Sequence, residues 1–264
     1  MSYIEVLENI KRRDENDKSK ELGALKVAKD AEVIDTTSIS IREVVNEISE
    51  IIKKKKIDIK LQKKIYKPRK ENAWKKFVRK AIKTILAGLY KISFRVKITG
   101  QVPSEGAYII CSNHINYLDA AAIVLFNKRK VNFVAKEDLF YHRILFWLGH
   151  LFDAIPIKRD MQDIDAMKRC LKVLKNGELL GIFPEGTRKG MEKNMKAKNG
   201  AAFMAIRSNV KVIPVGIHGT FKPFSKVYIN YGEPIDFSQY SKEQLDEATE
   251  TIMNQIVMLT KKED

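Results

Sequence analysis

The chain has 264 residues, of which 44% are hydrophobic and 31% charged, and its net charge at pH 7 is +16. This length and composition exclude a disordered chain and leave room for one large α/β domain or a medium domain with an appendage. The two cysteines exclude a disulfide framework and indicate a reducing compartment, and no apolar run is long enough for an ordinary transmembrane helix.

The positive charge is concentrated in one block of the chain. Residues 1–52 carry 8 Lys/Arg and 12 Asp/Glu, residues 53–100 carry 18 and 2, and residues 101–264 carry 23 and 19. Such a block binds phosphates, either on nucleic acid or on a membrane surface. Because lysine outnumbers arginine fifteen to three in this block, base recognition is disfavoured and an anionic membrane surface is the predicted partner.

Residues 1–52 resemble the C-terminal end of cytidylate kinases, on the stretches "RRDENDKSK", "AKDAEVIDTT" and "SIREVVNEI". The segment departs from that family at Lys20 and at Gly23-Ala24. The chain also lacks the G-x-x-x-x-G-K-[ST] loop that cradles nucleotide phosphates. We therefore interpret residues 1–52 as a vestigial fragment without kinase activity. Its N-terminus has no apolar core, so no secretory signal is expected.

The basic stretch that follows, residues 53–70, is predicted to be a linker. In residues 71–93, apolar side chains recur at three- and four-residue steps, with Lys76, Arg79, Lys80 and Lys83 on the other side. A cationic amphipathic helix with Trp and Phe is typical of a segment lying in the membrane interface. The alternative is a surface helix packed on its own domain. The basic linker favours the membrane.

From residue 94 onward, apolar runs alternate with helical patterns. This alternation predicts an α/β domain over residues 94–264, with a mixed, largely parallel sheet and helices on both faces. The expected strands are 94–100, 107–112, 131–136, 153–158, 178–186, 210–219 and 226–232. The expected helices are 118–127, 138–150, 161–176, 198–208 and 240–261.

The stretch "CSNHINYLDA" places His114 five residues before Asp119, just after an expected strand. If a turn separates them and Asp119 opens the next helix, the carboxylate can accept the Nδ1 proton of the imidazole. Nε2 is then free to take a proton from an alcohol. The alternative is a loop histidine beside a helix-capping aspartate. Taken alone, this spacing does not decide between them.

A second stretch, "GIFPEGTRKG", follows another expected strand. Gly186 allows close backbone approach to a ligand, and the planar guanidinium of Arg188 suits a phosphate. The alternative is an ordinary polar turn. His114 and Arg188 each follow a strand of the same domain, as substrate groups gathered at one sheet edge do.

Four stretches together resemble the motifs of the glycerolipid acyltransferases. "NHINYLD", "FDAIPIKR", "FPEGTR" and "VIPVGIHG" occur in that order within residues 94–235. The second motif often opens with glycine, and Asp153 stands near that place. The resemblance implies transfer of a fatty acyl group from a thioester to the free hydroxyl of 1-acyl-glycerol 3-phosphate (lysophosphatidic acid), giving phosphatidic acid.

The resemblance also implies roles for individual residues. His114 is then the general base, Asp119 orients it, and the hydroxyl attacks the thioester directly, without an acyl-enzyme. Asn113 supports the turn and is counted among the substrate-binding residues, and Glu185 orients Arg188 or a neighbouring amide. The expected phosphate-binding group consists of Glu185, Gly186, Thr187, Arg188 and Arg159. No metal or cofactor is expected, and acyl-CoA or acyl-acyl carrier protein is the co-substrate.

Three alternatives remain open at this point. One is the same chemistry on another acceptor, such as glycerol 3-phosphate or a different lysolipid. The others are a nucleic-acid-binding protein and a non-catalytic lipid-binding module. The expected location is the cytoplasmic face of the cell membrane, with peripheral attachment.

Overall fold

The structure is a computed structural model that describes residues 8–9, 11–12, 33–52, 71–158, 163–191 and 195–261. The chain divides into two units, Met1–Gln62 and Lys63–Asp264. The expected linker, residues 53–70, lies outside the described residues.

The described part of the first unit contains a helix over residues 41–52. Ser40 precedes this helix, and its backbone N–H donates to the Glu43 carboxylate at 2.7 Å. The Glu43 N–H in turn lies 3.4 Å from the Ser40 hydroxyl oxygen. These reciprocal contacts satisfy N–H groups that the first turn of a helix leaves without partners.

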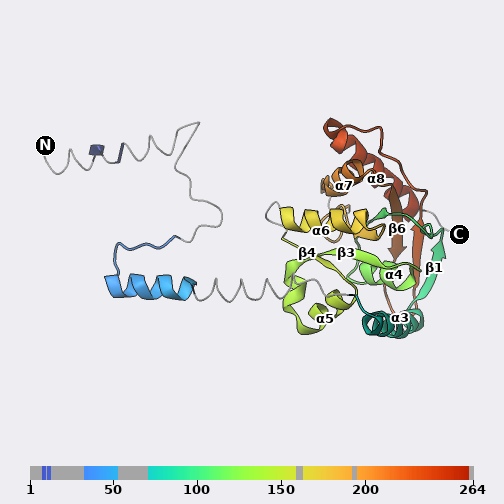
Figure 1. Ribbon diagram of the computed structural model, residues 1–264, viewed down its shortest axis with the longest axis horizontal. Helices are drawn as coiled ribbons and strands as arrows, with labels where there is room; N and C mark the ends of the chain where they lie inside the picture. The colour runs from blue at the N-terminus through green and yellow to red at the C-terminus, as the bar shows by residue number, and fades with distance from the viewer. Residues whose placement is uncertain are drawn as a thin grey trace. The chain divides into compact units, whose positions relative to one another are not determined.

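The second unit is built on a seven-stranded sheet with the order β1-β7-β6-β2-β5-β3-β4 (Figure 1). Neighbouring strands are parallel except for β6 and β7, which are antiparallel. The predicted mixed, largely parallel sheet is thus confirmed. The strands are β1 (Arg95–Thr99), β2 (Tyr108–Ser112), β3 (Val131–Lys136), β4 (Ile155–Ile157), β5 (Leu179–Ile182), β6 (Val212–Gly219) and β7 (Lys226–Tyr231).

Helices cover both faces of this sheet, as predicted (Figure 1). Successive β2 residues point to opposite faces, so Ile109 packs in one core and Ile110 in the other. The first core includes residues of α6 (Ile164–Lys175), α7 (Gly200–Ser208) and α8 (Leu245–Thr260). The second includes residues of α3 (Ala73–Ser93) and α4 (Asp119–Phe126).

The helix expected over 138–150 is interrupted. Glu137–Tyr141 form a 3-10 helix, His142 is extended, and α5 spans Arg143–Leu151. The break lets the Phe140 ring fold back onto α5 at Gly149. A Cβ on Gly149 would lie 2.6 Å from that ring, so the glycine makes the packing possible. A second 3-10 turn, η2 (Lys242–Gln244), precedes α8.

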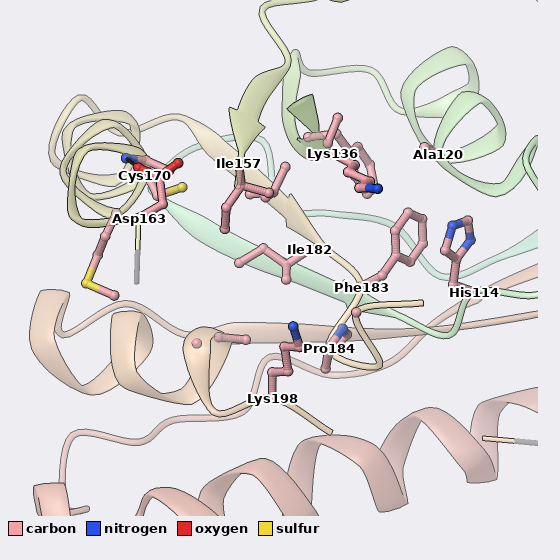
Figure 2. Close-up of a pocket in the computed structure, with 18 of the residues that line it drawn as sticks. His114, Ala120, Lys136, Ile157, Asp163, Cys170, Ile182, Phe183, Pro184 and Lys198 are labelled. Atoms are coloured by element: carbon pink, nitrogen blue, oxygen red, sulfur yellow. Dashed lines mark hydrogen bonds between the residues drawn. The ribbon is translucent and has the colours of Figure 1, made fainter. Parts of the chain in front are cut away.

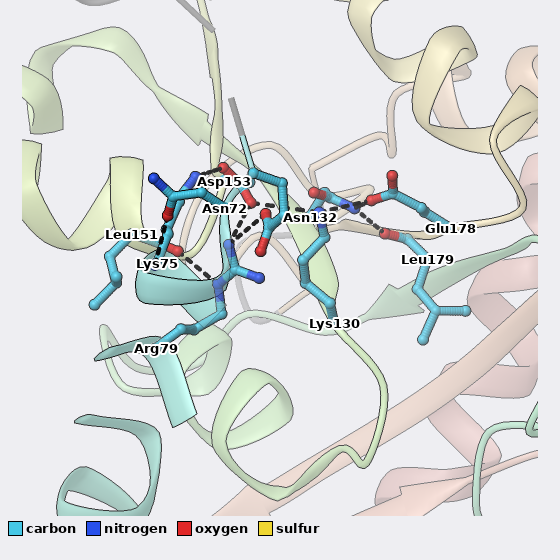
Figure 3. A network of polar contacts seen from close by, with 10 residues as sticks. Asn72, Lys75, Arg79, Lys130, Asn132, Leu151, Asp153, Glu178 and Leu179 are labelled. Carbon is cyan, nitrogen blue, oxygen red and sulfur yellow. Dashed lines mark hydrogen bonds and ion pairs between the residues drawn. The ribbon is translucent and has the colours of Figure 1, made fainter. Parts of the chain in front are cut away.

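A polar network attaches α3 to the sheet (Figure 3). Asp153 lies at its centre and pairs with Lys75, with Arg79 at 2.9 Å and with Lys130 at 3.3 Å. Arg79 also donates from Nε to the Leu151 carbonyl at 2.7 Å. Asp153 has a φ of +53°, a left-handed conformation that Asp tolerates better than most residues. The residue that departs from the family pattern therefore anchors the helix.

Two of the four cations on the polar side of α3 face the domain and not the solvent. Arg79 faces the domain, and Lys83 donates to the Asn127 carbonyl at the end of α4. Lys76 and Lys80 remain exposed on the helix. The helix therefore turns part of its cationic side inward, because Asp153 and the last α4 carbonyl offer partners there.

Candidate active site

His114 lies beyond the carboxyl end of β2, which is flanked by β5 and β6 in parallel. Its Nδ1 is 2.9 Å from Oδ2 of Asp119. Asp119 is the first residue of α4, so the chain turns between the two residues as the spacing predicts. The histidine side chain is 15% exposed and the aspartate side chain is fully buried. This geometry orients the imidazole and leaves Nε2 available to a ligand.

The Asp119 carboxylate also organises the turn. Its Oδ2 accepts the backbone N–H groups of Ile115 and Asn116, each at 2.7 Å. Together with the imidazole contact, these bonds fix the position of the carboxylate at the N-terminus of α4. Its field extends to α3: burial first, and the Asp119 charge second, raise the pKa of the Tyr90 phenol.

The strand β5 supports His114 from the next position in the sheet. The imidazole stacks on the Phe183 ring, with centroids 4.1 Å apart and planes 9° apart. Glu185 is 3% exposed, and its Oε1 accepts the His114 backbone N–H at 2.9 Å. Its Oε2 accepts the Met191 N–H at 2.9 Å. Both carboxylate oxygens of Glu185 thus accept backbone N–H groups, and its contribution to substrate binding stays a prediction.

Gly186 and Arg188 form the loop after β5. Gly186 has a φ of +66°, and a Cβ there would lie 2.9 Å from Cε of Lys198. Only glycine fits this position without strain. The Arg188 guanidinium stacks on the Tyr117 ring, with its carbon 3.3 Å from the ring centroid. This contact fixes the guanidinium plane on the same side of the site as His114, because Tyr117 belongs to the His114–Asp119 turn.

Asn113 connects β2 to β6. Its Nδ2 donates to the Ile217 carbonyl and its Oδ1 accepts the Ile217 N–H, both at 2.7 Å. The side chain is 3% exposed. These two bonds tie the segment after β2 to β6, and the expected contribution of Asn113 to substrate binding stays a prediction.

The structure gives fewer contacts for the remaining residues of the expected site. Arg159 lies outside the described residues, in the gap 159–162. Thr187 is partly buried within the loop after β5. His218 stacks on Tyr228 of β7 with centroids 4.4 Å apart and does not line the pocket at His114.

A pocket of about 380 Å³ extends from His114 along the carboxyl edge of the sheet (Figure 2). His114 lies at one end and Cys170 lies toward the other (Figure 2). The lining between them is largely apolar and comes from β3, β4, β5, α6 and α7, with Phe133, Ile157, Met167, Ile182 and Met204 among its members. Burial raises the pKa of the Cys170 thiol to about 12, so this cysteine contributes an uncharged, apolar wall.

Three lysines line the same pocket, namely Lys136, Lys158 and Lys198. Sequence reasoning missed all three, and it missed the Phe183 stack and the Tyr117–Arg188 contact. Lys136 and Lys158 end the expected strands 131–136 and 153–158, so their place at the carboxyl edge could have been noticed. Lys198 enters the pocket from the segment before α7, which no strand pattern indicates.

Within the described residues, no group of three or more His, Cys, Asp or Glu side chains is arranged to hold a metal ion. Among the described helices, none combines the length and the apolar character needed to cross a bilayer.

Two family models match separate parts of the chain. Residues 93–218 match the model described as Acyltransferase, and residues 1–54 match that of cytidylate kinase. The second match agrees with the resemblance of the N-terminal segment.

Two curated relatives of this chain carry the same name. The "1-acyl-sn-glycerol-3-phosphate acyltransferase" of Streptococcus pneumoniae is 33% identical over 60% of this chain and 61% of its own length. The protein of that name from Bacillus subtilis is 29% identical over 72% of this chain and 98% of its own length. The chain thus spans less than two thirds of the pneumococcal relative.

A solved structure shares the fold. The 1-acyl-sn-glycerophosphate (LPA) acyltransferase PlsC from Thermotoga maritima superposes with a TM-score of 0.59. The match covers 77% of this chain and 88% of that chain at 23% sequence identity.

Proposed function

Residues 93–218 match the acyltransferase family model, and from this premise we propose that the protein acylates 1-acyl-glycerol 3-phosphate to phosphatidic acid. The observation that carries the proposal is the His114–Asp119 pair at one end of an apolar pocket. A base beside a space suited to an alkyl chain is what acyl transfer between lipids requires. The names of the relatives support the same acceptor.

In the proposed reaction, His114 Nε2 takes the proton of the acceptor hydroxyl as its oxygen attacks the thioester carbonyl. The tetrahedral intermediate then collapses, the carbon–sulfur bond breaks, and the thiolate leaves with the proton from the imidazolium. Asp119 stabilises that imidazolium through Nδ1. The charges balance without a covalent intermediate on the protein.

The acceptor phosphate is proposed to bind at the loop after β5. Arg188 presents a guanidinium oriented by Tyr117, and the Gly186 backbone gives close access. Arg159 and Thr187 are proposed to join them. The lysines of the pocket wall add positive charge, whereas Glu185 supports the loop from behind. The apolar part of the pocket is proposed to hold the fatty chain.

The direct test is release of thiol from acyl-CoA and from acyl-acyl carrier protein, with three acceptors in parallel. Lysophosphatidic acid is expected to support release, whereas glycerol 3-phosphate and a lysolipid without a phosphomonoester are not. Release that is faster with glycerol 3-phosphate would assign the alternative acceptor. No release with any acceptor would favour a non-catalytic lipid-binding module.

We also propose that the protein attaches peripherally to an anionic membrane through α3. Apolar side chains of this helix are turned away from the domain: Trp74 is 70% exposed, Phe77 64%, Ile85 62% and Ile92 70%. A surface helix packed on its own domain buries such side chains. Here the inward side includes Tyr90, Leu86 and Ala87 at the core, together with Arg79 and Lys83, while these four large apolar side chains stay outside it.

The apolar surface extends from α3 to α5. Trp74 and Val78 share a hollow with Trp147 of α5, and Ile144 next to it is 67% exposed. Tryptophan is favoured at membrane interfaces because one ring combines an apolar body with a polar N–H. The two helices therefore offer one continuous surface for the acyl-chain boundary of a bilayer.

Replacing Phe77, Ile85 and Ile92 with serine is expected to release the protein from anionic vesicles. Each side chain contributes about 1.5 to 3 kcal/mol when fully buried in lipid, so vesicle affinity should fall by at least about 10²-fold. Activity on vesicle-borne acceptor should fall with it, while activity on a short-chain soluble acceptor should persist. Co-sedimentation and thiol release measure the two effects.

The matched control replaces Ile164, Met195 and Met258, which are 63%, 51% and 63% exposed and lie outside α3. This control should bind vesicles as the wild type does. Equal loss of activity on soluble and vesicle-borne acceptor in the α3 variant would mean that the helix supports the catalytic domain and not membrane attachment.

The first unit is proposed to take no part in catalysis. Deleting residues 1–52 should leave acyl transfer within about twofold of the full chain, because no residue of the proposed site comes from this segment. Turnover on soluble acceptor measures the effect of this deletion on acyl transfer. A truncated protein with a normal melting transition but no activity would show that the vestige interpretation is wrong.

A further inference from the structure

A groove of about 670 Å³ lies between α3 and the end of α4, apart from the pocket at His114. Seven of its eleven lining residues are Lys or Arg, and none of the eleven is acidic. Its walls come from α3 on one side and from the segment 125–130 on the other. The groove is thus a concave surface whose charged residues are all positive.

Three of these cations already have partners in the protein. Arg79 and Lys130 pair with Asp153, and Lys83 donates to the Asn127 carbonyl. These contacts hold α3 against the domain, so the positive charges of the three residues already have partners within the protein.

The other four cations are Lys76, Lys80, Lys91 and Lys128. Within the described part of the chain none of these four forms an ion pair. Lys91 contacts an aromatic face, with Nζ 5.8 Å from the Phe126 centroid. Like charges gathered in one concavity repel one another, and a bound anion relieves that repulsion. The groove therefore has the charge of an anion site.

The groove also borders the exposed apolar side of α3. Phe77 is three residues from Lys80, and Ile92 is four residues from Gly88 in the groove wall, so each pair is adjacent on the helix surface. A lipid whose chains lie against Phe77 can place its headgroup beside Lys80. A free nucleotide or an acidic protein would not need this neighbouring apolar surface in order to bind the lysines.

We propose that this groove binds the phosphomonoester headgroup of an anionic phospholipid, at a site distinct from the catalytic pocket. A phosphomonoester carries about −1.5 to −2 charges at pH 7 and offers three acceptor oxygens, which suits several lysines better than the single charge of a phosphodiester. This identification rests on the proposed function: the phospholipid with a phosphomonoester headgroup is then the product of the reaction, phosphatidic acid. The protein is thus held on membrane regions that contain its product.

The test compares binding of the full chain to two sets of phosphatidylcholine vesicles, without an acyl donor. One set contains phosphatidic acid and the other contains phosphatidylglycerol at twice the mole fraction, which matches the surface charge. The wild type is expected to bind the phosphatidic acid vesicles about tenfold more tightly. The variant Lys76→Gln/Lys80→Gln/Lys128→Gln should lose that preference and keep a normal melting transition.

The matched control is Lys168→Gln/Lys172→Gln/Lys242→Gln, which removes three exposed lysines outside the groove. It should retain the preference. Equal binding of the wild type to both vesicles overturns the proposal, as does equal loss of preference in the control. A preference that survives the groove variant belongs to the catalytic pocket and overturns it as well.

Competition identifies the occupant. Dihexanoyl phosphatidic acid should displace the wild type from phosphatidic acid vesicles, and inorganic phosphate at equal concentration should not. Displacement by acyl carrier protein or by an oligonucleotide with equal efficiency would assign the groove to a macromolecule and overturn the proposal. A chain that releases no thiol but keeps the lysine-dependent preference would refute the proposed function and support the groove site.

Discussion

The His114→Ala variant is expected to lose acyl transfer by a factor of about 10² to 10⁴, the usual effect of removing a positioned general base. The backbone of this turn is held by Glu185 and by Asp119 through its contacts to the next two amides, and alanine leaves those bonds in place. The fold and the vesicle binding should therefore be unchanged. Steady-state turnover with saturating lysophosphatidic acid, together with a melting curve, measures both effects.

His142→Ala is the matched control, because His142 is exposed and lies outside the pocket. It should retain wild-type turnover. A His114→Ala protein that is folded and keeps more than a tenth of wild-type turnover would rule out His114 as the base.

The Asp119→Asn variant is expected to be almost as damaging, with a loss of about 10²-fold or more. The amide is isosteric but neutral, so it cannot stabilise an imidazolium at Nδ1. The amide oxygen can take the place of Oδ2 and accept its three donors, but the NH₂ group then lies at the buried position of Oδ1, which has no hydrogen-bond partner. A buried donor without a partner costs about 1 to 3 kcal/mol, so the unfolding free energy should fall by a similar amount.

Asp165→Asn is the control for this change, because the Asp165 side chain is 81% exposed and lies on α6. Turnover and urea unfolding of the two variants should differ clearly. If Asp119→Asn matched Asp165→Asn in both measurements, the carboxylate would have no part in the chemistry or in the turn.

The sequence predicts most of the fold because its elements are short and strongly patterned. Buried parallel strands such as Leu179–Ile182 read as continuous apolar runs, and α6, which precedes this strand, buries Ala166, Cys170 and Leu174 at four-residue steps. The His114–Asp119 contact is also predictable, because it depends only on a local turn and on the start of α4. Local chemistry is enough for these features.

Other features depend on strand order, which the sequence does not contain. Phe183 stacks on His114, and Glu185 accepts the His114 amide, because β5 lies next to β2. Nothing in either motif by itself indicates this pairing. The same holds for Asn113, whose partner Ile217 is 104 residues away in sequence.

The sequence alone also does not determine which side of α3 faces the domain. An amphipathic helix can turn either side toward its domain, and the usual choice is the apolar side. Here Asp153 and the Asn127 carbonyl draw Arg79 and Lys83 inward, and large apolar side chains such as Phe77 and Ile85 remain exposed. The deciding residues lie more than forty positions away along the chain.

The central claim is direct transfer of an acyl group from a thioester to lysophosphatidic acid, assisted by His114. The most direct measurement follows released thiol and phosphatidic acid together, with and without acceptor, and records the intact mass of the protein in each sample. The account predicts thiol release only when acceptor is present, one phosphatidic acid for each thiol, and an unchanged protein mass. Thiol release without acceptor, accompanied by a protein heavier by one acyl group, would contradict it.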